Sequence, residues 1–374
     1  MSPILNPDFI KEHFPSLQEM AYLNNAATGI PPKRTISAMQ KYLENRVEGK
    51  GDFEETVAAF KKIRESLALL LGGNTECYAF APSTSHGLNI FAHGIEYPAG
   101  SNIVICDLEF PANYVPWQHA AKMYNSELRV IKSKEGAITY DNISNIVDEN
   151  TRLIAVSLVQ FGSGFRSDVA KLAELAHHNG AYLVTDIIQA AGWQNINLEK
   201  WGVDFAAAQS AKWLLGPIGA GFVYFRKEIL DDVSPRFLGW WSVEDMHEFN
   251  YAERVLAKGA TKFEVGSPAM IAYVGFKQSI NFLMEIPAEE RERVALDNAS
   301  YLRTRLSEIG IEYYEFPESN QSPIVSCKPE NVEELNKELK KNNIHCSVRN
   351  GRLRVSPHFY NTHEEIDRLI ENLR

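Results

Sequence analysis

A lysine and an aspartate, each at the end of a run of apolar residues, are the side chains whose types and spacing could do chemistry together. Lys212 follows the run 203–208, and Asp186 closes the run 181–185. A lysine amine can form a Schiff base with pyridoxal 5'-phosphate, and a carboxylate can keep the pyridine nitrogen protonated so that the ring accepts electrons from a substrate carbanion. Either residue alone is typical of a loop charge, but the pair predicts such a cofactor site.

Three further segments carry residue types that this chemistry needs. Thr84 and Ser85 open a predicted helix, where hydroxyls and free backbone N–H groups can bind phosphate, although an ordinary helix cap is the alternative. Phe110 follows the next predicted strand and could stack on a flat ring or simply fill the core. The Arg354 guanidinium could bind a substrate carboxylate in bidentate fashion, with a surface ion pair as the alternative.

The elements that must position these residues alternate between strand and helix patterns. Residues 102–106 and 152–157 are expected to form strands, and 168–176 a helix capped by Ser167. The strand ending at Asp186 follows at once. This alternation predicts a mainly parallel sheet with helices on both faces, in which ligands bind beyond the carboxyl ends of the strands.

The sequence pattern changes after about residue 265. Predicted elements in this part are helices at 268–284 and 287–309, strands at 323–326 and 353–355, and a closing helix at 362–373. We therefore predict an α/β chain with a large, doubly wound, mainly parallel sheet domain over residues 21–265. A smaller α+β domain is predicted from residues 1–20 and 266–374.

Composition limits the remaining possibilities. The chain has 374 residues, 45% of them hydrophobic, and a formal net charge of −10 without a basic stripe, so nucleic acid is an unexpected partner. We find no apolar run of about 18 residues, which argues against a membrane span, and the sequence pattern does not support a secretory signal. The four cysteines are scattered without metal-ligand spacing, so we expect a reduced, cytoplasmic protein without a metal site.

Four motifs in order give the chain a specific resemblance. It resembles the class V aminotransferase family of fold-type I pyridoxal phosphate enzymes, which includes cysteine desulfurases, selenocysteine lyase and isopenicillin N epimerase, and more distantly kynureninase. The similarity runs from Tyr22 to Asp367. The motifs that carry it are Asp186-Ile187-Ile188-Gln189, Lys212-Trp213-Leu214-Leu215-Gly216-Pro217, Phe263-Glu264-Val265-Gly266-Ser267-Pro268, and Arg354-Val355-Ser356-Pro357-His358 before Asn361-Thr362.

The resemblance implies a role for each matched residue. Lys212 would hold the cofactor and shuttle the proton at the substrate α-carbon, and Asp186 would pair with the pyridine nitrogen. Gln189 would bind the phenolic oxygen of the ring, Phe110 would stack on the ring, and Arg354 would bind the substrate carboxylate. The other implied contacts are Thr84, Ser85, Gln209 and Ser210 to the phosphate, Ser267 to the phosphate of the neighbouring subunit in a homodimer with shared active sites, and Asn25 to the substrate.

The sequence also departs from the cysteine desulfurases. Their nucleophilic cysteine lies on a loop shortly before the arginine segment, but here the segment 347–351 runs directly into Arg352, and Cys346 lies on a predicted strand. Ala211, Phe110 and Phe161 replace residues that are usually histidine, histidine and asparagine in that branch.

These departures set the expected reaction. We expect a homodimeric enzyme that acts on a small amino acid through an external aldimine and a quinonoid, as an aminotransferase or C–S lyase without a persulfide cysteine. The alternatives are an isopenicillin N epimerase-like or kynureninase-like enzyme, or a non-catalytic pyridoxal phosphate-binding protein.

Overall fold

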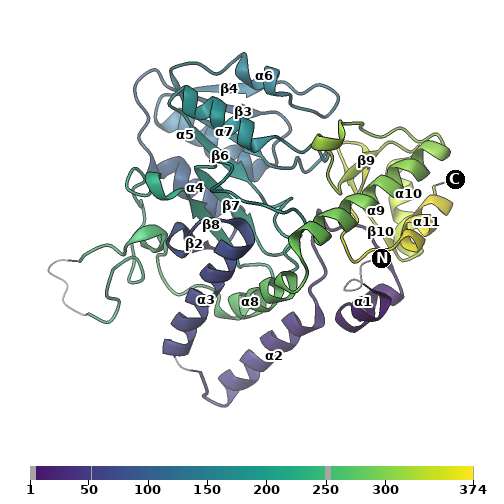
Figure 1. The fold of residues 1–374 in the computed structure, drawn as a ribbon, viewed down its shortest axis with the longest axis horizontal. Coiled ribbons are helices and arrows are strands. Elements are labelled where there is room, and N and C mark those ends of the chain that lie inside the picture. Colours follow the sequence, from purple (N-terminus) through teal and green to yellow (C-terminus); the bar gives the residue numbers. More distant parts are fainter. Residues whose placement is uncertain (1–5, 52, 249–253, 374) are drawn as a thin grey trace.

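A seven-stranded sheet forms the centre of the larger part of the molecule (Figure 1). The computed structural model of the chain describes residues 6–51, 53–248 and 254–373. The strands stand in the order β2-β8-β7-β6-β5-β3-β4. Their bounds are β2 Tyr78–Ala81, β3 Asn102–Cys106, β4 Glu127–Ile131, β5 Thr151–Ser157, β6 Tyr182–Asp186, β7 Phe205–Gln209 and β8 Gly221–Phe225.

The sheet is mainly parallel, as predicted. Pairs β3–β4, β3–β5, β5–β6 and β6–β7 are parallel, whereas β8 runs antiparallel to both β7 and β2. In β6, Leu183 packs into the core cluster on one face of the sheet and Val184 into the cluster on the other face. Both faces of these strands are therefore buried, which explains their uninterrupted apolar runs.

Helices cover both faces of the sheet. Helices α4 and α5 pack on one face through residues such as Leu88 and Trp117, while α3 and α7 pack on the other through Leu67 and Leu172. The helix bounds in this part are α2 Lys33–Val47, α3 Phe53–Leu71, α4 Thr84–Gly94, α5 Val115–Met123, α6 Tyr140–Ser144, α7 Val169–His178 and α8 Met270–Met284.

The predicted N-cap of α7 is wrong by one residue. Asp168, not Ser167, caps this helix by accepting a hydrogen bond from the backbone N–H of Lys171. The Ser167 hydroxyl instead donates to the backbone oxygen of Ser157 at the end of β5. Both residue types are good caps, so the sequence pattern alone does not separate them.

The smaller α+β part lies beside the large sheet (Figure 1). Its three-stranded antiparallel sheet has the order β11-β12-β9. A separate parallel pair joins β1 to β10. The bounds are α1 Pro7–His13, α9 Ala288–Glu308, α10 Val332–Lys341, α11 His363–Glu371, β1 Ala21–Tyr22, β9 Val325–Cys327, β10 Ile344–His345, β11 Ser347–Arg349 and β12 Arg352–Val355.

The start of the predicted large domain makes contacts with the small one. Ala21 pairs with Ile344, and both pack in the apolar core of the small part. Among the residues before it, Phe14 packs its ring against Tyr360. Residues 1–5 of the predicted small domain lie outside the described residues. The division at residues 21 and 265 stays a prediction.

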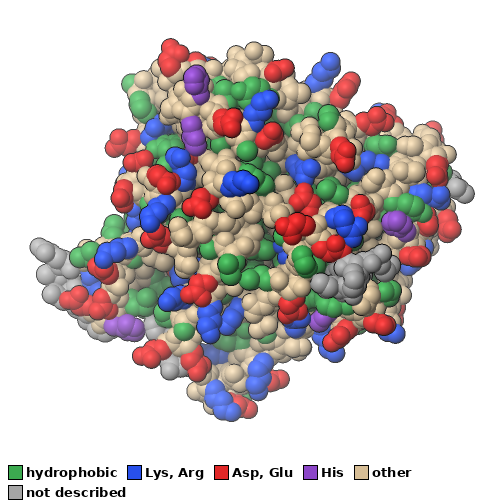
Figure 2. Space-filling model, in the orientation of Figure 1, with side chains coloured by type: hydrophobic (Ala, Val, Ile, Leu, Met, Phe, Trp, Pro, Cys, Tyr) green, Lys and Arg blue, Asp and Glu red, His purple; other side chains and the backbone are tan. Residues whose placement is uncertain are grey.

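Charged side chains of both signs alternate over the face of the molecule in Figure 2, with no continuous basic area on that face. None of the helices in the described part of the chain has the length and apolar character needed to cross a membrane.

Candidate active site

The carboxyl ends of β5, β6 and β7 meet at a cavity of about 450 Å³. Asp186 is the last residue of β6, and Lys212 follows β7 by three residues. The structure therefore brings together the two residues whose pairing the sequence predicts. The other predicted site residues that line this cavity are Thr84, Ser85, Phe110, Gln189, Gln209 and Arg354.

Burial shifts the pKa values of the central pair. The Asp186 side chain is buried, and this burial raises its pKa, while the charge of Lys212 and a hydrogen bond from the Ile188 N–H act in the opposite direction. Burial also lowers the pKa of Lys212, against the influence of Asp186. An amine with a lowered pKa has more of its neutral, nucleophilic form at neutral pH, which is the form that attacks an aldehyde.

A tight turn holds Lys212 in place. Leu215 adopts a φ of 56° and donates its backbone N–H to the Lys212 oxygen at 3.0 Å. Gly29 donates to the Ala211 oxygen at 2.9 Å. A Cβ at Gly29 would lie 2.1 Å from the Lys212 oxygen, so only glycine allows this approach.

Gln189 is part of the framework behind this turn. Its side-chain oxygen accepts a hydrogen bond from the Trp213 indole at 2.7 Å, and its amide nitrogen donates to the Ala26 oxygen at 3.0 Å. Because an amide nitrogen carries two hydrogens, one donor remains for a group in the cavity. The expected contact with a ring oxygen stays a prediction.

Phe110 covers the same cavity from the loop after β3. Its ring centroid lies 5.7 Å from the Lys212 amine, and the ring of Phe161 meets it edge-on at 5.1 Å. Glu109 anchors this loop. Its buried carboxylate accepts hydrogen bonds from the backbone N–H of Ser157 and from the Gln160 amide, both at 2.8 Å. Sequence reasoning missed Glu109, since nothing marks it in the sequence except its place beside Phe110.

Two sets of buried polar atoms match the anionic groups of a pyridoxal phosphate site. Thr84 begins α4, and its buried hydroxyl has no hydrogen-bond partner. Arg354 donates one nitrogen, Nη1, to the Phe161 oxygen at 2.8 Å, whereas its Nε and Nη2 have no partner. Burial and the charge of Arg349 lower the pKa of Arg354. Because unpaired buried donors are costly, an anion at each position would stabilise the site.

Three predicted site residues do not line this cavity. The Asn25 side chain donates to the Ser356 oxygen at 2.8 Å and accepts from the Tyr360 hydroxyl. Ser210 donates its hydroxyl to the Pro217 oxygen at 2.5 Å. Ser267 lines a neighbouring cavity of about 320 Å³. Their proposed contacts with substrate and phosphate stay predictions.

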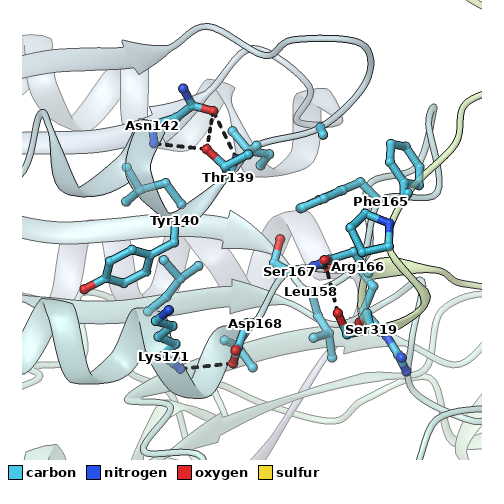
Figure 3. A pocket seen from close by; sticks show the side chains of 18 of the residues that line it. Thr139, Tyr140, Asn142, Leu158, Phe165, Arg166, Ser167, Asp168, Lys171 and Ser319 are labelled. Carbon is cyan, nitrogen blue, oxygen red and sulfur yellow. Dashed lines mark hydrogen bonds between the residues drawn. The ribbon is translucent and has the colours of Figure 1, made fainter.

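A larger cavity of about 720 Å³ lies elsewhere, between α6, the start of α7 and the segment 315–320 (Figure 3). None of the predicted catalytic or cofactor-binding residues lines it. Several of its polar groups serve local structure: Thr139 and Asn142 cap α6, and Arg166 donates to the Ser319 oxygen. Size alone therefore does not identify the site of chemistry.

The four cysteines of the chain are all buried and unpaired by disulfides. Cys346 lies between β10 and β11, and its exposed fraction is 1%. Burial raises the pKa of its thiol. None of the four is among the residues that line the 450 Å³ cavity.

The arrangement of Lys212 and Asp186 at the carboxyl ends of a doubly wound sheet defines a class of protein, the fold-type I pyridoxal phosphate enzymes. Within that class, the chain belongs to the class-V aminotransferase family, whose model matches residues 21–369. The predicted family, fold and cofactor are thereby confirmed: the chain is a pyridoxal phosphate-dependent enzyme.

Named relatives share nearly the whole length of the chain. A probable cysteine desulfurase of Methanothermobacter thermautotrophicus is 28% identical over 97% of this chain and 96% of its own. An uncharacterized aminotransferase of Bacillus subtilis, YcbU, is 28% identical over 98% of this chain and 97% of its own.

Solved structures agree on the fold. The apo structure of a cysteine desulfurase from Thermococcus onnurineus has a TM-score of 0.90 at 24% identity and covers 99% of this chain and 98% of its own. A cystine C–S lyase, solved with its reaction product cysteine persulfide, has a TM-score of 0.89 at 21% identity and covers 96% of this chain and 98% of its own.

Proposed function

We propose that this enzyme acts on a small amino acid as an aminotransferase or C–S lyase and uses no cysteine persulfide of its own. The observation that carries this proposal is one cavity that contains Lys212, Asp186 and the unpaired edge of Arg354 but no cysteine. We further propose that the enzyme works as a homodimer in the cytoplasm.

The residues that line the cavity have separate roles in the proposed reaction. When bound, pyridoxal phosphate supplies an electron-withdrawing ring that makes the substrate α-proton acidic. The Nε and Nη2 atoms of Arg354 bind the α-carboxylate in bidentate fashion and fix the amino acid. The amine of Lys212, with its lowered pKa, takes the α-proton onto Nζ and returns it. Phe110 covers the reacting atoms and excludes water from one side.

The competing function is a persulfide-forming cysteine desulfurase, which the names of several relatives favour. Such an enzyme needs a thiolate that can reach the substrate sulfur. Cys346 is buried, its pKa is raised, and it lies outside the cavity, which supports a reaction without it.

A panel of amino acids tests the reaction. The holoenzyme is incubated with each amino acid, with and without a keto acid, and keto acid, sulfide and racemised product are measured. We expect keto acid from at least one amino acid. Racemised product alone would support the epimerase alternative, and absence of any turnover would support a non-catalytic binding protein.

Mass spectrometry after incubation with cysteine tests the persulfide. We expect no adduct of about 32 Da, the mass of one sulfur, on any cysteine. The Cys346→Ser variant should keep turnover within a few-fold of the parent, and Cys77→Ser is the matched control for loss of a buried thiol. A stoichiometric adduct on Cys346, with activity lost in Cys346→Ser alone, would establish the desulfurase.

A further inference from the structure

The hairpin that carries Arg354 is short and closes with a tight turn. Strands β11 and β12 are joined by Asn350 and Gly351, whose φ angles are 53° and 70°. Two successive residues in the left-handed region form the tight two-residue turn that suits a twisted hairpin. The register pairs Arg349 with Arg352 and Ser347 with Arg354. Because directly opposed residues share a face of the sheet, positions 349 and 354 lie on the same face.

This geometry brings a second guanidinium to the active site. Arg349 lines the same cavity as Arg354 and is half-buried. Its side chain donates from Nη1 to the Val348 oxygen at 2.7 Å. No acidic side chain of the described residues forms an ion pair with either arginine. The charge of Arg349 also lowers the pKa of both Arg354 and Lys212, so the two arginines and the lysine repel one another.

The charges of the cavity do not balance. Its charged or titratable lining residues are Asp186, Lys212, Arg349 and Arg354, and the two guanidinium groups stay charged whether or not the lysine is protonated. The family resemblance assigns the cofactor phosphate to the start of α4, where backbone N–H groups and hydroxyls can hold it. An α-carboxylate accounts for Arg354. Arg349, which is half-buried, is therefore left without an anionic partner.

We propose that Arg349 binds a second anionic group on the substrate side chain, so that the preferred substrates are amino acids with a side-chain carboxylate or sulfinate. This inference rests on the proposed function and names its substrate class. A guanidinium suits both groups, because its parallel N–H donors match two oxygens held on one atom. The two-residue turn places Arg349 at the end of β11, beside the cavity that Arg354 also lines.

Kinetics with matched substrate pairs test this proposal on the holoenzyme. The pairs are aspartate with asparagine, glutamate with glutamine, and cysteine sulfinate with cysteine. We expect the parent to prefer the anionic member of at least one pair. Arg349→Gln should lower kcat/KM for that member by about 10- to 100-fold, the loss typical of a charge-assisted hydrogen bond, and leave the neutral member within about threefold. Arg349→Lys should recover part of the loss.

Two controls separate this role from folding and from α-carboxylate binding. Arg352 lies on the same hairpin, but its guanidinium pairs with Glu312 and does not line the cavity. Arg352→Gln should therefore change kcat/KM equally for both members of a substrate pair. An equal loss for both members in Arg349→Gln would mean that Arg349 assists Arg354, and this would overturn the proposal. Thermal unfolding of each variant shows whether the fold is kept.

Binding without turnover distinguishes failure of this proposal from failure of the proposed function. Calorimetry compares succinate with butyrate, which has one carboxylate less. We expect succinate to bind at least about tenfold more tightly, and this difference to vanish in Arg349→Gln. If amino acids are converted but succinate binds no more tightly than butyrate, the second anion site is refuted and the proposed function stands. If succinate binds more tightly than butyrate only when Arg349 is present, but no amino acid reacts, the proposed function fails and the anion site stands.

Discussion

At the scale of single residues, burial explains why Lys212 and Asp186 can do chemistry that exposed residues of the same types cannot. Burial disfavours the charged form of each side chain, which lowers the pKa of the lysine and raises that of the aspartate. Each charge then depends on the other and on what binds in the cavity. A protonated nitrogen of a bound cofactor would give Asp186 the partner that favours its carboxylate form.

Replacing Lys212 by alanine should abolish covalent attachment of the cofactor. The amine at this position is the one that lies in the cavity beneath Phe110. Borohydride reduction of the holoenzyme, followed by peptide mass spectrometry, should give a reduced adduct on Lys212 in the parent and none in Lys212→Ala. An adduct on another lysine of the variant, at parental stoichiometry, would show that the assignment is wrong.

Asp186→Asn should slow catalysis much more than it changes stability. The amide has nearly the same shape but cannot keep a pyridine nitrogen protonated. We expect kcat to fall by at least ~100-fold, or ~2.7 kcal/mol of transition-state stabilisation. Steady-state kinetics and urea unfolding measure the two effects. Turnover close to that of the parent would reject the electron-sink role of Asp186.

At the scale of elements, the sequence predicts what periodicity and local chemistry decide. The strands before Asp186 and Lys212 follow from apolar runs, and their carboxyl ends do meet at one cavity. The antiparallel direction of β8 and the pairing of Ala21 with Ile344 were not predicted. Strand direction and the pairing of distant segments depend on tertiary packing, which leaves no local pattern.

The site residues that sequence reasoning missed share the same cause. Glu109 is a charged residue whose role comes from hydrogen bonds to Ser157 and Gln160, about fifty positions away. Arg349 lines the cavity from the end of β11, where a two-residue turn pairs it with Arg352. Asn25 has the residue type expected for a substrate contact, but its side chain forms hydrogen bonds with Ser356 and Tyr360 of the same chain. Only the packed structure distinguishes these outcomes.

The segment after β12 supports the Lys212 turn through a buried histidine. His358 Nδ1 accepts a hydrogen bond from the Phe359 N–H at 2.8 Å, so Nε2 carries the hydrogen that points to the Trp213 oxygen at 3.1 Å. Burial lowers the pKa of His358 from 6.5 to about 3. Below pH 6.5, the pKa of this histidine in the unfolded chain, the unfolded chain takes up a proton that the folded chain does not.

Stability should therefore fall on acidification through pH 6.5, with a contribution from His358 of up to about 1.4 kcal/mol per pH unit. Urea unfolding of the apo protein from pH about 7.5 to about 5 measures this slope. His358→Gln should lower stability at neutral pH but flatten the acid slope. His178→Gln, on the surface of α7, controls for removal of an imidazole. An unchanged slope in His358→Gln would mean that another group causes the acid loss.

At the scale of the whole molecule, an apolar surface lies next to Ser267. Phe237, Leu238 and Val265 have exposed fractions of 75%, 58% and 39%. Gly239 packs so closely against the Val265 backbone that a Cβ at position 239 would lie 1.9 Å from the Val265 oxygen. The segment around Phe237 and the one leading to Ser267 are therefore side by side. Large apolar side chains gathered on a surface are typical of an interface with another chain, which supports the proposed homodimer.

Subunit complementation tests whether Ser267 serves the site of the partner. Heterodimers that combine one Lys212→Ala chain with one Ser267→Asp chain are isolated with two different tags. Each homodimer should be nearly inactive, because the first lacks the amine and the second places a carboxylate against the phosphate. If Ser267 acts across the interface, both defects fall in one site of the heterodimer and the other site is complete, so activity should return to about half of the parent. If Ser267 serves its own chain, each site keeps one defect and the heterodimer stays inactive. Sedimentation at assay concentration completes the test, since a fully active monomer would rule out a shared site.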